Sequence, residues 1–202
     1  MPTVIVATGN PGKLKEMQVY LDDLGWQLEL KPNELDIDET GTTFLENARL
    51  KAAGVAKALH QWAIADDSGL EVRALGGAPG IYSARYADSD QARIERLLQE
   101  LAREGAKLGA APGGDRSAQF VCALALANPA GEIVLETEGI CPGEILPAPR
   151  GTGGFGYDPI FYVPALGKSF AEMSAPEKEA HSHRGVAFEQ LMPQLKKLAL
   201  PL

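Results

Sequence analysis

The sequence predicts an α/β protein, and three observations support this fold class. The chain opens with an apolar β-branched run at 3–7, a turn, an amphipathic segment at 13–24 and a strand-like run at 27–30. Further amphipathic segments alternate with strand-like runs along the rest of the chain. Hydrophobic residues make up 45% of the 202 residues and charged residues 23%, which is enough apolar material for a sizeable core.

The expected helices are placed by apolar stripes and by end signals. Apolar residues recur every three or four positions across 13–24, and Gly25 ends that helix. Thr43 and Glu46 have the spacing of a capping box, which predicts a helix from there to about residue 61. Residues 90–104 form another well-marked amphipathic segment.

Shorter patterns predict the strands and connections. Residues 63–65 form a short apolar run that ends at the turn formers of 66–69. Residues 105–114 contain four glycines and one proline, which makes them a possible boundary between two lobes of a single domain over 1–202. The other predicted elements are strands at 70–75, 117–127, 132–139 and 160–163, a short helix starting within 174–177, and a final helix at 185–198.

The charge balance limits the classes of partner. Lys and Arg number 19 and Asp and Glu 27, so the formal net charge is 19 − 27 = −8. An acidic surface repels a phosphate backbone, so nucleic acid is not expected as a partner. No apolar run approaches the roughly 20 residues that span a bilayer, and the start does not resemble a signal peptide, so no membrane is expected. Cys122 and Cys141 are too few for a disulfide framework, which favours a reducing, cytoplasmic setting.

A glycine-rich turn separates the first strand from the first helix. Its sequence is Thr8-Gly9-Asn10-Pro11-Gly12-Lys13. Backbone N–H groups at a helix N-terminus, together with a lysine charge, suit a phosphate group. The turn is not a Walker A loop, because Ala7 and Leu14 stand where that pattern needs glycine and Ser or Thr. The alternative is an ordinary turn with an exposed lysine.

Two adjacent acids, Asp66 and Asp67, follow a predicted strand. Because neighbouring side chains on a strand point to opposite faces, only one of them needs to face a ligand. Carboxylates at a strand end suit Mg²⁺, which takes a few oxygen ligands together with substrate phosphates. Asp38 and Glu39 offer further carboxylates from an acidic loop. The alternative is that 66–69 form only a turn.

Two later segments carry groups that suit a nucleotide base. In the glycine-dense stretch 153–159, Phe155 could stack on a base and Asp158 could accept a hydrogen bond from a ring N–H. Lys178 and the run 182–184 add donors for phosphate or carbonyl oxygens. The alternatives are aromatic side chains that belong to the core and a solvated helix end.

Six segments, in this order, span residues 8 to 185. They are Thr8-Gly9-Asn10-x-Gly12-Lys13 with Glu16; Phe44-x-Glu46-Asn47-Ala48 with Lys51-Ala52; Ala65-Asp66-Asp67-Ser68-Gly69-Leu70; Gly76-Gly77-x-Pro79-Gly80-Ile81-Tyr82-Ser83-Ala84-Arg85-Tyr86; Gly153-Gly154-Phe155-Gly156-Tyr157-Asp158-Pro159; and Ser182-His183-Arg184-Gly185. Together they resemble the inosine triphosphate pyrophosphatase family, which acts on non-standard purine nucleoside triphosphates. One such segment would be weak support, but the full set in order is very specific.

The resemblance implies a reaction and an architecture. The expected reaction converts a nucleoside triphosphate and water into the monophosphate and pyrophosphate, with ITP, dITP and XTP preferred over ATP and GTP. The resemblance also implies Mg²⁺, a homodimer, and a two-lobed fold with a long mixed β-sheet, flanking helices and a central nucleotide cleft.

The resemblance further implies a role for each matching residue. It makes Asp67 the proton acceptor and a metal ligand, with Lys13 and Glu16 as the other catalytic positions, and it places the second metal ligand at Asp38 or Glu39. The implied substrate-binding residues are Thr8, Gly9, Asn10, Pro11, Gly12, Lys13, Ser68, Phe155, Gly156, Tyr157, Asp158, Lys178, His183 and Arg184. Hypoxanthine and xanthine carry the acceptor O6 where adenine carries an amino donor, so donors near residues 183–184 would favour the first two bases.

Two other functions fit parts of the same pattern. One is a Maf-type nucleotide pyrophosphatase with another base preference, which the His183-Arg184 segment and the context of Asp67 disfavour. The other is a catalytically silent nucleotide-binding regulator, which is disfavoured because Lys13, Glu16 and the other candidate catalytic positions are all filled.

Overall fold

Strands and helices alternate along the chain in the computed structural model, which describes residues 1–107 and 114–198. The strands are β1 (Thr3–Val6), β2 (Gln27–Leu30), β3 (Trp62–Val72), β4 (Ser117–Ala127), β5 (Ile133–Ile145), β6 (Phe161–Val163) and β7 (Lys168–Ser169). The α-helices are α1 (Pro11–Leu21), α2 (Phe44–Leu59), α3 (Asp90–Lys107), α4 (Ala175–His181) and α5 (His183–Leu195).

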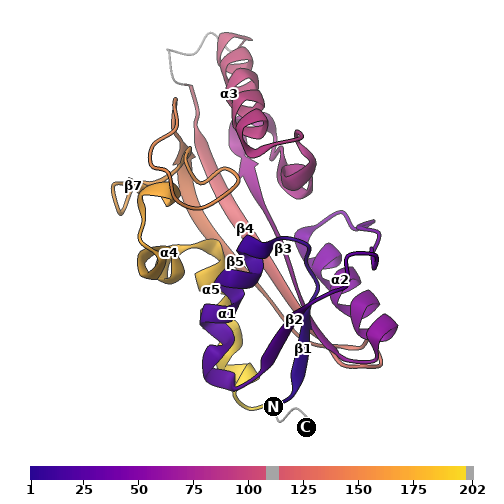
Figure 1. The fold of residues 1–202 in the computed structure, drawn as a ribbon. Coiled ribbons are helices and arrows are strands. Elements are labelled where there is room, and N and C mark those ends of the chain that lie inside the picture. Colours follow the sequence, from indigo (N-terminus) through magenta and orange to yellow (C-terminus); the bar gives the residue numbers. More distant parts are fainter. Residues whose placement is uncertain (108–113, 199–202) are drawn as a thin grey trace. The chain divides into compact units, whose positions relative to one another are not determined.

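The strands of the described residues form one seven-stranded sheet in the order β2-β1-β3-β4-β5-β6-β7 (Figure 1). β1 pairs in parallel with β2 and with β3, whereas β5 with β6 and β6 with β7 are antiparallel. The expected α/β class and the long mixed sheet flanked by helices are therefore confirmed.

The chain divides into two compact units. Unit 1 comprises Met1–Asp67, Cys122–Gly139 and Arg184–Leu202, and unit 2 comprises Ser68–Val121 and Ile140–His183. The lobe boundary expected at 105–114 falls largely on residues 108–113, which lie outside the described residues, so it stays a prediction.

In unit 1, helices α1 and α5 pack on one face of the strands, and α2 lies on the other face (Figure 1). The rings of Tyr20 and Phe188 stack with their centroids 4.5 Å apart, which joins α1 to α5. In the core beneath them, Val4 and Val6 of β1 and Ile64 of β3 have no exposed surface. Burial of these side chains holds the end of β1 and the start of α1 in place.

In unit 2, helix α3 packs its apolar stripe into a core that contains several aromatic rings. Leu97 of α3 is fully buried, and Ile94 and Leu101 lie on the same face. The ring of Phe120 lies edge-on to that of Phe161, with centroids 4.7 Å apart. This core supports the glycine-dense stretch that the sequence singles out.

Several helix ends form as their sequence signals predict. Thr43 caps α2, since its Oγ1 accepts a hydrogen bond from the N–H of Glu46 at 3.1 Å. Gly25 follows the first helical region in the left-handed conformation, with φ of 63°. Ser174 and Glu177 form a capping box at the start of α4.

The structure corrects the expected turn at 66–69. Strand β3 runs without interruption from Trp62 to Val72, so Asp66 and Asp67 lie inside a strand instead of ending one. The final helix, expected at 185–198, begins at His183, and α5 has no solvated start because Arg184 is buried. Within the described residues, no helix is long and apolar enough to cross a membrane.

Candidate active site

The turn expected to bind phosphate is held by its own side chains. Asn10 caps α1, because its Oδ1 accepts hydrogen bonds from the N–H groups of Gly12 at 2.8 Å and Lys13 at 3.4 Å. Thr8 Oγ1 accepts a hydrogen bond from the N–H of Asn10 at 3.1 Å. Three of the backbone N–H donors in the turn expected to bind phosphate are therefore already occupied, so the charge of Lys13 is the main attraction this turn offers.

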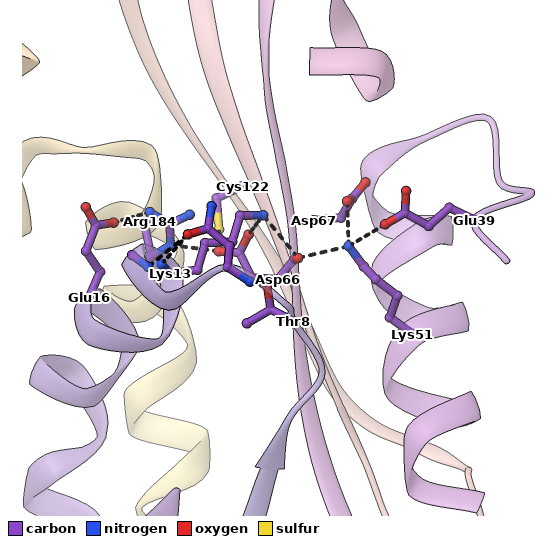
Figure 2. Close-up of polar contacts among 11 residues, drawn as sticks. Thr8, Lys13, Glu16, Glu39, Lys51, Asp66, Asp67, Cys122 and Arg184 are labelled. Atoms are coloured by element: carbon purple, nitrogen blue, oxygen red, sulfur yellow. Dashed lines mark hydrogen bonds and ion pairs between the residues drawn. The ribbon is translucent and has the colours of Figure 1, made fainter. Parts of the chain in front are cut away.

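The side chain of Lys13 leads to a buried ionic network around Asp66 (Figure 2). Lys13 Nζ lies 2.6 Å from Asp66 Oδ1, and Arg184 Nε donates to Asp66 Oδ2 at 2.7 Å. Cys122 Sγ lies 3.3 Å from the same Oδ2 atom, and Arg184 Nη1 contacts the carboxylate of Glu16. Buried ions are stable only when paired in this way, which explains how β3 accommodates Asp66.

The two buried members of this network keep their charges. Burial raises the pKa of Asp66, but attraction by Arg184 and Lys13 outweighs it, so the pKa lies well below the ordinary value. Burial lowers the pKa of Arg184, but attraction by Asp66 and Glu16 moves it well above the ordinary value. Asp66 is therefore a fixed negative charge at neutral pH.

A second network, on the other side of Asp66, is centred on Lys51 of α2 (Figure 2). Lys51 Nζ lies 2.6 Å from Asp67 Oδ1 and 3.0 Å from Glu39 Oε1. The same ammonium donates to the peptide oxygen of Asp66 at 3.0 Å. One lysine thus ties together two carboxylates that the sequence analysis names as metal ligands.

Lys51 carries no predicted role of its own, although it lies within a matching segment. A signal was present in the helical pattern. Phe44, Ala48 and Val55 of α2 are buried and follow helical spacing, and Lys51 falls on that same stripe. A lysine on the buried face of a helix needs an acidic partner, so its position alone predicts an ion pair.

Asp67 has the properties of a metal ligand and of a base. Its Oδ2 is buried and makes no hydrogen bond to any of the described residues. Burial raises the pKa of Asp67 above the ordinary value, and attraction by Lys51 offsets that rise only in part. A buried carboxylate oxygen that lacks a partner fits a divalent cation or a bound water.

Glu39 is the better placed of the two candidate second ligands. It shares the ammonium of Lys51 with Asp67, whereas no hydrogen bond or ion pair connects Asp38 with Asp67 or Lys51 in the described structure. No group of three or more His, Cys, Asp or Glu side chains gathers to hold a metal within the described ranges. Two carboxylates suit Mg²⁺, which completes its coordination with water and substrate phosphates.

In unit 2, the glycine-dense stretch is fastened by Asp158. Its Oδ2 accepts hydrogen bonds from Lys178 Nζ at 2.6 Å and from the N–H of Phe155 at 2.9 Å. Lys178 Nζ also lies 4.8 Å from the centroid of the Phe155 ring. Gly154 has φ of 74°, and any Cβ there would collide with the Asp158 carboxylate, so this loop requires glycine.

Other predicted base-pocket residues lie in the same unit. The His183 ring stacks on Phe120, with centroids 4.6 Å apart, and is 4% exposed, so it belongs to a buried aromatic cluster. Tyr157 is buried and donates its hydroxyl hydrogen to the Ser83 peptide oxygen at 2.9 Å. The N–H of Gly156 donates to Asp90 Oδ2 at 2.8 Å.

The predicted site residues fall into two sets. Unit 1 contains Thr8, Gly9, Asn10, Pro11, Gly12, Lys13, Glu16, Asp38, Glu39, Asp67 and Arg184. Unit 2 contains Ser68, Phe155, Gly156, Tyr157, Asp158, Lys178 and His183. Arg184 was expected at the base, yet its guanidinium contacts Asp66 and Glu16, so a role at the base stays a prediction.

Both cysteines are buried and free, so neither forms a disulfide. Cys122 contacts Asp66, while Cys141 belongs to the core of unit 2, where burial raises the pKa of its thiol to about 11. Neither thiol is therefore placed as a nucleophile.

Comparisons with known proteins place this geometry in context. A model of the Ham1 family matches residues 4–194. A relative named dITP/XTP pyrophosphatase from Synechocystis is 60% identical over 194 residues, covering 96% of this chain and 95% of that protein. A relative of the same name from Nostoc is 58% identical over 192 residues, covering 95% and 93%. The solved structure of a HAM1 protein from Coxiella burnetii has a TM-score of 0.86 at 43% identity, covering 98% of this chain and all of that one.

Proposed function

This chain belongs to the Ham1 family, and from this premise we propose that it hydrolyses dITP, ITP and XTP to the monophosphate and pyrophosphate. One observation of the structure carries the proposal: two lysine ammonium groups and three carboxylates gather around residues 66 and 67 of β3. Hydrolysis of a phosphoanhydride needs cations that bind the triphosphate. It also needs nearby carboxylates that bind a metal ion and orient a water molecule. A non-standard purine is the base that the names of the relatives indicate.

The chemistry divides between the residues of unit 1. Water attacks the α-phosphorus, the bond from that phosphorus to the bridging oxygen breaks, and pyrophosphate leaves with the negative charge. Asp67 orients this water and accepts its proton, for which its raised pKa is suited. Lys13 stabilises the charge that develops on the departing pyrophosphate. Lys51 pairs with both Asp67 and Glu39 and so keeps their carboxylates close together.

We propose that Mg²⁺ binds at Asp67 and Glu39. The buried, unpartnered Oδ2 of Asp67 supports this choice, as does the position of Glu39 on the same lysine. A bound Mg²⁺ supplies neutralisation of phosphate charge and acidifies a nearby water. In the chain itself, Lys51 keeps the two carboxylates together, because their repulsion would otherwise separate them.

For the base, we propose a pocket built by unit 2. Phe155 offers a ring face for stacking, Lys178 a donor for O6 of hypoxanthine or xanthine, and His183 a further polar edge. Adenine presents an amino donor at that position, and an unmatched buried polar contact costs about 1–3 kcal/mol, which is roughly 5- to 150-fold in rate.

We further propose a homodimer in the cytoplasm, as the family resemblance implies. Two buried free thiols in the described chain accord with a reducing compartment. The oligomeric state is checked by sedimentation of the full chain, where a monomer at every concentration would contradict the dimer.

A pyrophosphate-release assay tests the proposal as a whole. The purified chain is given dITP, XTP, ITP, ATP and GTP in turn, with and without Mg²⁺. We expect turnover that depends on Mg²⁺ and a higher kcat/KM for the first three nucleotides. Preference for another base would favour the Maf-type alternative, and binding without release of pyrophosphate would favour a silent regulator.

A further inference from the structure

Asp66 is the meeting point of Lys13 and Lys51, although the sequence predicts no catalytic or binding role of its own for this residue. Its carboxylate holds Lys13 at 2.6 Å and Arg184 at 2.7 Å. Its peptide oxygen accepts hydrogen bonds from Lys13 Nζ at 3.3 Å and from Lys51 Nζ at 3.0 Å. One residue with no exposed surface therefore sets the positions of two ammonium groups.

The register of the sheet explains why this peptide oxygen is available. β1 pairs with β3 only as far as Val6 and Ile64, and the N–H of Ala7 takes the peptide oxygen of Ile64 at 2.8 Å. Carbonyl groups on the same edge of a strand recur every second residue, so the next one on the β1 side is that of Asp66. This oxygen lies beyond the last residue of β1 that pairs with β3. The ammonium groups of Lys13 and Lys51 donate to it in place of a backbone N–H group.

The carboxylate is matched to its two cations. Lys13 pairs with Oδ1 and Arg184 with Oδ2, so the two cations use different oxygens. Asp66 contacts three cations, because Lys51 Nζ donates to its peptide oxygen in addition to the two cations at its carboxylate. Without the negative charge, Lys13 would face two neighbours of its own sign, and its long side chain would lose a fixed position.

We propose that Asp66 is a positioning residue, which fixes the ammonium groups of Lys13 and Lys51 for the triphosphate and acts only through them. This inference rests on the proposed function, since it assigns phosphate binding to those lysines. It differs from the role of Asp67, whose carboxylate points to the opposite face of β3 and pairs with Lys51.

The central variant is Asp66→Asn, which keeps the volume and the peptide oxygen but removes the charge. The amide has one oxygen and one N–H₂ group, so one of the two cations would meet a donor. The probe is inorganic tripolyphosphate, which carries phosphates and no base, and its binding with Mg²⁺ is measured by calorimetry. IMP, which carries the base and a single phosphate, is measured in parallel.

We expect Asp66→Asn to weaken tripolyphosphate binding by about tenfold or more, as for loss of a charged hydrogen bond, and to change IMP binding about twofold at most. In a Lys13→Met background, the same substitution should have little further effect on tripolyphosphate, since Asp66 acts through that lysine. Equal weakening of both probes, or full additivity of the two substitutions, would overturn the inference.

Cys122→Ala is the matched control. It removes the thiol that contacts Asp66 Oδ2 and leaves both lysines in place. It should lower the melting temperature while tripolyphosphate binding stays within about twofold of the parent, because thiol hydrogen bonds are weak. If Cys122→Ala weakens tripolyphosphate binding as strongly as Asp66→Asn, general destabilisation explains both results and the inference fails.

A second variant covers the case in which Asp66→Asn does not fold. Asp66→Glu keeps the charge but moves the carboxylate by one methylene, so we expect weaker tripolyphosphate binding with IMP binding retained. Unchanged tripolyphosphate binding in Asp66→Glu would contradict a positioning role. Because these measurements need no turnover, they are separate from the proposed function, which fails only if the unaltered chain releases no pyrophosphate from any of the nucleotides.

Discussion

Two adjacent carboxylates of β3 differ in their surroundings, and this difference assigns their roles. Asp66 faces Lys13 and Arg184, which keep its pKa well below the ordinary value despite burial. Burial raises the pKa of Asp67, and Lys51 only partly offsets it. Neighbours on a strand point to opposite faces, so one residue stays a permanent anion while the next is closer to accepting a proton.

The first prediction concerns Asp67. Replacing it with Asn keeps the shape but removes the proton acceptor and one metal ligand, so kcat for dITP should fall by about 10²- to 10⁴-fold. Binding of ITP, measured by calorimetry, should remain detectable because the base contacts are untouched. Unchanged turnover in Asp67→Asn would remove this residue from the proposed role.

At the scale of elements, helix α4 depends on its capping box and on one ion pair. Glu177 accepts from the N–H of Ser174 at 2.9 Å and lies 2.5 Å from Lys168 Nζ. The hydrogen bond from Lys168, followed by those from Ser174, lowers the pKa of Glu177 to about 2. Since α4 also carries Lys178, the cap helps to fix a residue of the proposed base pocket.

The second prediction is the pH dependence of that cap. A carboxyl whose pKa is lowered in the folded state stabilises the fold above its ordinary value of 4.5, and this contribution is lost as the pH falls toward about 2. Glu177→Gln should therefore melt slightly below the parent at pH 7, and this gap should close as the pH falls between the two pKa values. Calorimetric scans across that pH range check it, and a gap independent of pH would contradict the assignment.

The elements also show what the sequence could and could not predict. The ends of α2 and α4 were predictable because Thr43 and Ser174 act on their own helices. The turn expected at 66–69 was wrong, because ion pairs from Lys13, Lys51 and Arg184 satisfy those acids inside a strand. These partners are distant in sequence, so no local pattern contains them.

The same reason applies to the candidate site. Matching segments predict Lys13, Asp67 and Asp158 as site residues, because glycine and acid spacing is visible in the chain. The place of Lys51 on the buried stripe of α2 predicts an acidic partner, but only the fold shows that its partners are Asp67 and Glu39. The solvated helix end considered for residues 183–184 is instead buried, because Arg184 meets its acidic partners in the interior.

At the scale of the whole molecule, the net charge of −8 opposes binding of any polyanion. A nucleoside triphosphate must therefore find local positive charge, and the two lysine ammonium groups near β3 carry fewer positive charges than the triphosphate carries negative ones. A divalent cation would supply the remainder, and this makes metal dependence a property of the overall charge balance.

The third prediction follows from that balance. Removal of divalent cations with EDTA should reduce pyrophosphate release from dITP to background, and Mg²⁺ added in excess should restore it. Ca²⁺ should restore less pyrophosphate release, because Ca²⁺ takes more oxygen ligands at longer distances than Mg²⁺. Two carboxylates together with substrate phosphates suit the smaller Mg²⁺. Full activity in EDTA would contradict the assignment of a metal to Asp67 and Glu39.

A substitution at Gly154 could disturb the base pocket proposed for unit 2 while leaving the phosphate-binding residues proposed for unit 1 unchanged. One added methyl group there would push Asp158 away from Lys178 and from the Phe155 amide, without altering any residue of unit 1. We therefore expect Gly154→Ala to bind inorganic tripolyphosphate as the parent does. Its kcat/KM should no longer differ between purine nucleoside triphosphates. Such a variant would separate binding of the departing pyrophosphate from recognition of the non-standard purine base.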